Sequence, residues 1–130
     1  AGIISVVVVA KFLGASQEVI MSLAPKAVTT PIAMEVSESI GGIPALTAAV
    51  VVCTGIFGGM AGFRIIKMGH VKSPIAGGLS MGTAAHAIGT SAAMERGDRY
   101  GAFSSLGLTL NGLLTALLSP VILSLLGYVP

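Results

Sequence analysis

The stretch SLAPKAVTTPIAME, residues 22–35, places two prolines, a lysine and three hydroxyl side chains inside an otherwise apolar region. Pro25 and Pro31 each lack the amide hydrogen that the interior of a helix requires. Thr30 precedes a proline and is therefore disfavoured in helical backbone. We expect the apolar segment 17–35 to break between the serine that opens this stretch and its second proline.

The composition of the 130-residue chain indicates an integral membrane protein. Hydrophobic residues make up 54% of it and charged residues 9%, whereas soluble domains carry about 25% charged residues. The apolar segments approach the ~20 residues of a spanning helix and do not alternate like barrel strands. The prediction is an all-α, polytopic transmembrane protein with a single membrane domain over 1–130. Because the chain opens with Ala1 inside an apolar run, we expect part of a membrane helix to precede it.

Five apolar segments are predicted, at about 1–14, 17–35, 43–63, 74–94 and 102–127. Glycines spaced four apart in the third and fourth segments predict close helix packing. The connection RIIKMGHVK, residues 64–72, carries three positive charges and no negative charge, which predicts a cytoplasmic position. Glu35 and Glu38 are then expected near the opposite face of the membrane.

An internal repeat relates the two halves of the chain. A shift of 60 residues brings 21–46 onto 81–106 with nine identical residues and no gap, and it pairs Lys26 with His86. We predict two repeat units, about 15–63 and 74–127, each an interrupted or re-entrant helix followed by a transmembrane span. Re-entrant segments would make the repeats inverted, whereas fully crossing segments would make them parallel.

Interrupted helices at corresponding positions are typical of the binding site of a secondary transporter. The free helix ends at such breaks offer amide donors to an anion. The candidate substrate-binding residues are Lys26, Thr29, Thr30, Ser80, Thr83, His86, Thr90 and Asn111. The candidate helix-break residues are Pro25, Pro31, Gly82 and Gly89.

Each candidate has a structural alternative. Lys26 either binds an anion or acts in a proton-linked switch, or it extends from a short re-entrant loop toward water. His86, expected on one helix face with Thr83 and Thr90, either binds an anion or carries a proton, or it is a hydrogen-bonded packing residue. The hydroxyls either bind substrate or recapture freed backbone groups. Asn111 either joins helices or lines the path.

Other classes of function lack support in the sequence. There is no HExxH or phosphate-loop motif, so we do not expect an enzyme. A lone histidine without nearby carboxylate or thiol ligands is poor evidence for a metal, and we expect no cofactor. No basic patch is interleaved with aromatic residues, so nucleic-acid binding is not predicted.

The stretches PKAVTTPIA, 25–33, and GTAAHAIGT, 82–90, resemble the LrgB/CidB family of bacterial membrane proteins. The same domain forms the C-terminal part of the plastid glycolate/glycerate translocator. The resemblance covers nearly the whole chain and corresponds to the C-terminal half or more of a family member.

The resemblance implies one of two functions. One is a carrier of small carboxylates such as glycolate, glycerate or pyruvate. The coupling ion of such a carrier could be a proton or another cation. The other is a holin- or antiholin-like modulator of murein hydrolase activity and cell lysis, acting as a pore or regulatory scaffold. The family implies an LrgA/CidA-type small membrane protein as partner. We expect a multi-pass homo-oligomer in the bacterial inner membrane, and the interrupted repeat favours the carrier.

Overall fold

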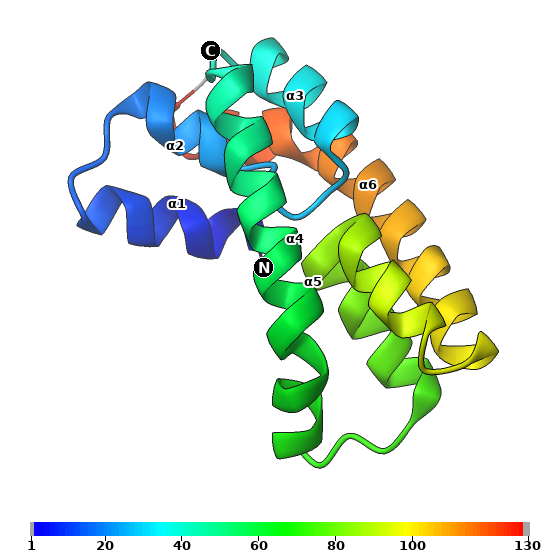
Figure 1. Cartoon of the computed structure of the whole chain (residues 1–130). Coiled ribbons are helices and arrows are strands. Elements are labelled where there is room, and N and C mark those ends of the chain that lie inside the picture. The colour runs from blue at the N-terminus through cyan, green and yellow to red at the C-terminus, as the bar shows by residue number, and fades with distance from the viewer. Residues whose placement is uncertain (1, 129–130) are drawn as a thin grey trace.

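The computed structural model describes residues 2–128, and all regular secondary structure in that range is helical (Figure 1). The helices are α1 (Gly2–Phe12), α2 (Gln17–Leu23), α3 (Thr30–Ser39), α4 (Pro44–Met68), α5 (Pro74–Met94) and α6 (Asp98–Leu125). The predicted all-α class is confirmed over these residues. The outermost positions of the predicted domain, 1 and 129–130, lie outside the described residues.

Two of these helices, α4 and α6, are long and apolar enough to cross a membrane, with 25 and 28 residues. Only 17% and 28% of their most apolar stretches are buried within the chain. Soluble proteins rarely expose so much contiguous apolar surface, whereas lipid tails would cover it favourably. Figure 1 shows that α4 and α6 run in opposite directions along the molecule.

Helices α4 and α6 extend beyond their predicted apolar segments into the charged residues beside them. Helix α4 continues to Met68, so Arg64 and Lys67 belong to its last turns and not to a connection. Cations are favourable there because they face the negative end of the helix dipole. Helix α6 begins at Asp98, four residues before its predicted start, because an acidic residue is favourable at the positive end of the helix dipole. The predicted segment 74–94 has the same bounds as α5.

Helices α2 and α3 form a fold-back unit beside the start of α4. The chain turns through residues 24–29 between them. The Thr47 hydroxyl in α4 lies 2.9 Å from the carbonyl oxygen of Ser22 in α2 and 2.7 Å from the hydroxyl of Ser37 in α3. Both arms therefore lie against the first turns of α4, and residues 24–29 form the tip of this unit, which we call the first tip.

Helix α5 reverses its direction in the middle. Ala85 has φ −126° and ψ 16°, and His86 has φ 42° and ψ −133°, so the helix is interrupted at these two residues. A Cβ atom at Gly89 would lie 2.6 Å from the carbonyl oxygen of Met81, although eight residues span about 12 Å in a straight helix. The two arms of α5 therefore pack against each other, and residues 85–86 form the second tip.

Glycines allow the second tip to reach α4 and α6. A side chain at Gly55 would overlap the ring of His86, and one at Gly58 would overlap Ala85. A Cβ atom at Gly82 would overlap the carbonyl oxygen of Ser104 in α6. Close approach of backbones at small residues is the usual way in which helices associate in lipid. The packing role predicted for the spaced glycines is confirmed at these contacts.

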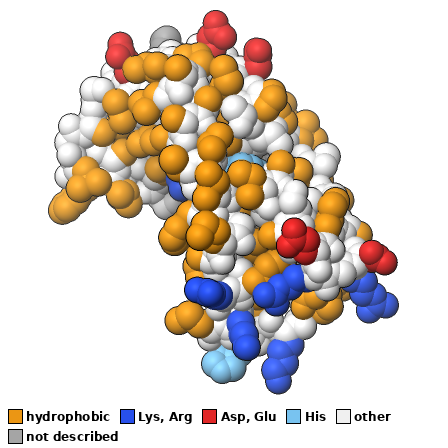
Figure 2. Space-filling model, in the orientation of Figure 1, with side chains coloured by type: hydrophobic (Ala, Val, Ile, Leu, Met, Phe, Trp, Pro, Cys, Tyr) orange, Lys and Arg blue, Asp and Glu red, His pale blue; other side chains and the backbone are white. Residues whose placement is uncertain are grey.

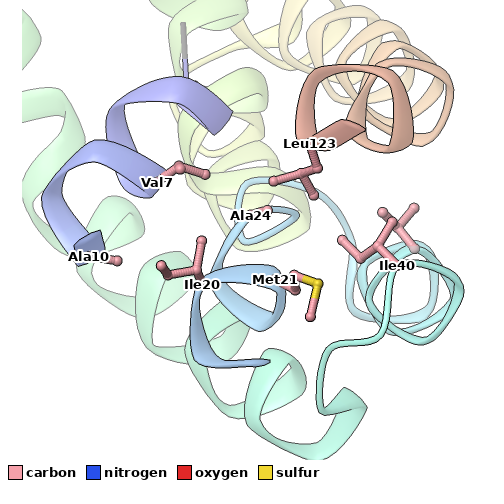
Figure 3. Close-up of a cluster of buried hydrophobic side chains, with 8 residues drawn as sticks. Val7, Ala10, Ile20, Met21, Ala24, Ile40 and Leu123 are labelled. Carbon is pink, nitrogen blue, oxygen red and sulfur yellow. The ribbon is translucent and has the colours of Figure 1, made fainter. Parts of the chain in front are cut away.

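A buried apolar cluster joins α1, α2, α3 and the end of α6 (Figure 3). Helix α1 contributes Val7 and Ala10, which approach Ile20 of α2. Leu123 of α6 packs into the same cluster and is fully buried. This cluster fixes α1 and the end of α6 beside the first fold-back unit.

The charges separate toward the two ends of the molecule (Figure 2). Lysines and arginines gather where α4 ends, together with the acidic residues of the α5–α6 turn, and further acidic residues lie at the other end. Hydrophobic side chains cover much of the face between them, most densely along α4. This distribution matches a slab of lipid between two aqueous faces.

Candidate functional site

The side chain of Asn111 joins the two fold-back units. Its Nδ2 atom donates one hydrogen bond to the carbonyl oxygen of Ala27, at 2.7 Å, and another to that of Thr83, at 3.2 Å. Ala27 belongs to the first tip, and Thr83 lies just before the second. Carbonyls at such interruptions lose their partners in the helix, and an amide from a neighbouring helix satisfies them. One residue of α6 thus holds both interruptions in place.

A pocket of about 250 Å³ lies beside this junction. Lys26, Asn111 and Thr115 supply polar groups to its wall, and α1 adds Ser5. Among the described residues the lining holds one cation and no carboxylate. The volume lies below the range of about 300–1,000 Å³ that suits drug-sized ligands. The pocket is therefore small, and Lys26 supplies its charged group.

His86 is buried at the second tip, with 3% of its surface exposed. Its Nε2 atom lies 2.8 Å from the carbonyl oxygen of Val51 in α4. Because a carbonyl can only accept, Nε2 carries the hydrogen and donates. The imidazole thus fastens the tip of α5 to the first half of α4, in the space that Gly55 leaves open.

The Thr90 hydroxyl bonds within its own arm of α5 and to α6. It lies 2.9 Å from the carbonyl oxygen of His86 and 2.9 Å from the hydroxyl of Ser104 in α6. The Thr83 hydroxyl donates within its own helix, to the carbonyl oxygen of Leu79 at 2.8 Å. Both hydroxyls therefore form hydrogen bonds within the protein.

Of the predicted binding residues, Lys26 and Asn111 line the pocket beside the junction. Thr29 is the N-cap residue of α3, but its side chain makes no capping hydrogen bond, and Thr30 begins that helix. Ser80 lies exposed on the first arm of α5. The structure therefore does not gather all eight residues around one pocket.

The shared helix face expected for Thr83, His86 and Thr90 is wrong. Thr83 is exposed, whereas His86 and Thr90 are buried. The expectation assumed an unbroken helix, and the reversal at residues 85–86 rotates the second arm away from the first.

The predicted helix-break residues lie around the interruptions in different ways. Pro25 is in the first tip, whereas Pro31 lies in the first turn of α3, where proline is well tolerated. Gly82 and Gly89 flank the second tip, and the non-helical residues lie between them. Both glycines serve close packing, because a Cβ atom at either position would meet backbone.

Three polar groups of this region were not predicted: the hydroxyls of Ser104 and Thr115 and the carbonyl of Val51. A pattern in α6 could have identified the two hydroxyls. Ser104, Asn111, Thr115 and Ser119 recur at helical spacing in an apolar segment and lie on its inner face. Within residues 2–128, no group of three or more His, Cys, Asp or Glu side chains is placed to hold a metal ion.

Comparison with known proteins assigns the family. The model of the LrgB-like family matches residues 1–125. The chain belongs to the LrgB-like family. Its LrgB-like relatives include a holin-like protein CidB of Staphylococcus epidermidis, 38% identical over 88% of this chain and 50% of the relative. An antiholin-like protein LrgB of Bacillus cereus is 39% identical over 96% of the chain and 54% of the relative.

An uncharacterized protein of Haemophilus influenzae is also similar, with 40% identity over 95% of this chain and 59% of the relative. The chain thus spans about half the length of the curated relatives it matches. No solved structure matches it.

Proposed function

We propose that this LrgB-like chain forms the substrate site of a membrane carrier for small carboxylates such as glycolate, glycerate or pyruvate. The observation that carries the proposal is the junction at Asn111, which bonds to Ala27 in the first tip and to Thr83 just before the second, beside a pocket that contains Lys26. A lysine within an apolar protein is costly unless it faces a cavity or a counter-ion. A carboxylate substrate would supply that counter-ion.

The proposed repeat is supported by a reciprocal pattern of contacts. The shift of 60 residues that pairs Lys26 with His86 also pairs Val51 with Asn111. Lys26 shares a pocket with Asn111, and His86 bonds to Val51. Each tip therefore faces the span of the other repeat. Together with the opposite directions of α4 and α6 (Figure 1), this supports inverted repeat units at about 15–63 and 74–127.

In the proposed site, the ammonium group of Lys26 pairs with the carboxylate, and the amide of Asn111 orients it. Thr29 and Thr30 stand at the N-terminus of α3, where the helix dipole favours an anion. Exchange between the two faces would require the tips to separate, and a proton or cation is the proposed coupling ion. His86 and Thr90 would then control the position of the second tip, and Ser80 and Thr83 would line the path on its outer side.

We also propose a second function, as a holin- or antiholin-like modulator of murein hydrolase activity and cell lysis. The names of the relatives in Staphylococcus epidermidis and Bacillus cereus favour this function over the carrier. It would place the protein in the bacterial inner membrane as a homo-oligomer, beside an LrgA/CidA-type partner and with residues 64–72 in the cytoplasm. Neither function requires catalysis or a cofactor.

Uptake of labelled glycolate and pyruvate into proteoliposomes separates the two proposals. A carrier gives uptake that saturates with substrate and is inhibited by unlabelled substrate. A holin-like pore gives flux that rises linearly with concentration and also admits uncharged solutes of similar size. A protein that gives no flux, yet changes the rate of autolysis when overproduced in cells, is a regulatory scaffold.

A further inference from the structure

A second cavity, of about 430 Å³, lies at the end of α4 that carries the positive charges. Its wall includes the cations Lys67, Lys72 and Arg96 together with His70. Among the described residues the lining contains no carboxylate. The cavity joins the α4–α5 connection to the α5–α6 turn, and it is separate from the pocket at Asn111.

Aromatic side chains hold one of these cations in place. The rings of Phe63 and Tyr100 pack edge to face, with 5.6 Å between centroids and 78° between planes. The guanidinium carbon of Arg96 lies 4.2 Å from the centroid of the Phe63 ring. Phe63 itself is 8% exposed, so Arg96 rests on a fixed wall. A cation held over an aromatic face is oriented without a carboxylate partner.

The cavity lies where apolar surface meets charged surface. Met60, Ile65 and Met68 on α4 are each more than half exposed, and the basic end begins at the same turns (Figure 2). Tyrosine is enriched at the level of lipid head groups, and Tyr100 lines the cavity. A free phosphate would use the cations alone, whereas a phospholipid would use the cations and the apolar surface together.

We propose that this cavity binds the head group of an anionic phospholipid. Basic pockets between transmembrane helices on the cytoplasmic side are suited to such head groups. The phosphodiester would pair with Lys72 and Arg96, and the acyl chains would lie along the exposed apolar face of α4. Because Lys72 and Arg96 flank the two ends of α5, the bound lipid would hold both arms of that helix at the membrane surface.

The test is equilibrium binding of fluorescent phosphatidylglycerol and phosphatidylcholine to the purified protein in non-ionic detergent. The variants are Lys72→Gln, in a connection outside the helices, and Arg96→Gln. The matched control is Arg99→Gln, which removes a positive charge at the same end but from a different cavity. Arg96→Lys keeps the positive charge. If it binds the lipid and Arg96→Gln does not, the loss of lipid binding in Arg96→Gln is due to the lost charge.

We expect the protein to prefer phosphatidylglycerol, and each of the two neutral variants to weaken its binding by roughly fivefold. Arg99→Gln and Arg96→Lys should bind within about twofold of the unmodified protein, and phosphatidylcholine binding should not change in any variant. Equal binding of the two lipids, or an equal loss in Arg99→Gln, would overturn the proposal. Displacement of the lipid by an equal concentration of inorganic phosphate would also overturn it, in favour of a soluble anion.

Discussion

At the scale of single residues, Asn111 has the most distinctive surroundings. It is a polar side chain in an apolar helix, and both of its hydrogen bonds go to carbonyls of segments far away in sequence. Asn111 therefore joins helices and also lines the pocket beside Lys26, so the two roles expected from the sequence do not exclude each other. The carbonyl oxygens of Ala27 and Thr83 would lose this donor if the amide were removed.

Asn111→Leu is expected to lower the free energy of unfolding by about 1 kcal/mol, because hydrogen bonds between membrane helices are worth roughly 0.6–1.7 kcal/mol. Thermal or denaturant unfolding in detergent measures the change. Thr109→Val is the matched control, since Thr109 lies in the same helix and its hydroxyl donates to the carbonyl oxygen of Ser105 in that helix. Equal effects of the two substitutions would contradict the role of Asn111 as a junction.

His86 combines a side-chain role with an unusual backbone conformation. Its φ of 42° is costly for any residue with a Cβ atom, by about 1–3 kcal/mol, whereas glycine adopts it readily. Both His86→Gly and His86→Ala remove the bond to Val51. We expect His86→Gly to be more stable than His86→Ala by about 1 kcal/mol, as measured by unfolding in detergent. A more stable alanine variant would indicate a straight helix at this position.

At the scale of elements, the two tips differed in how well the sequence could predict them. The first was predictable because prolines cannot continue a helix. The second has alanines at 84, 85 and 87, which favour an unbroken helix, so the sequence left open whether this segment crosses the membrane or re-enters. Contacts with other helices decide its conformation: Gly55 and Gly58 admit the tip, and Val51 accepts the imidazole hydrogen. Sequence reasoning about one segment cannot include contacts of this kind.

The fold-back of α5 predicts a short distance between its ends. Spin labels at positions 73 and 95, with Cys53 replaced by serine, should lie less than about 20 Å apart, because packed helix arms are about 8–10 Å apart between axes. Labels at positions 45 and 67, with the same separation along the continuous helix α4, should give about 33 Å. Double electron–electron resonance measures both distances. A distance near 33 Å for the first pair would contradict the hairpin.

The contact between α5 and α6 depends on the absence of a side chain at Gly82. A methyl group there would overlap the Ser104 carbonyl, and backbone cannot move aside as a flexible side chain can. Gly82→Ala should therefore lower the free energy of unfolding by about 1–3 kcal/mol. Gly69→Ala is the control, since its Cβ atom would find no contact closer than 3.5 Å. Similar stability of Gly82→Ala and the control would show that the helices are farther apart.

At the scale of the whole molecule, charge, apolar surface and direction of the helices give one consistent arrangement. The basic end and the acidic end lie on either side of an apolar belt (Figure 2). Between them, Asn111 joins the first tip to the arm that leads into the second. The sequence predicted the helical class and most helix positions from apolar runs and charges. The pairing of tip with span required the three-dimensional structure, because Val51 contributes a backbone carbonyl and no side-chain signal.

The measurement that tests the proposed carrier site most directly is saturable uptake of labelled glycolate and pyruvate into proteoliposomes by Lys26→Gln. Lys11→Gln is the matched control, because Lys11 is exposed at the end of α1 and lies outside the pocket. If Lys26 pairs with the substrate carboxylate, its substitution should lower kcat/KM by roughly tenfold to hundredfold, and the control should transport like the unmodified protein. Unchanged saturable uptake by folded Lys26→Gln, or an equal loss in both variants, would contradict a carboxylate site at the junction of the two tips.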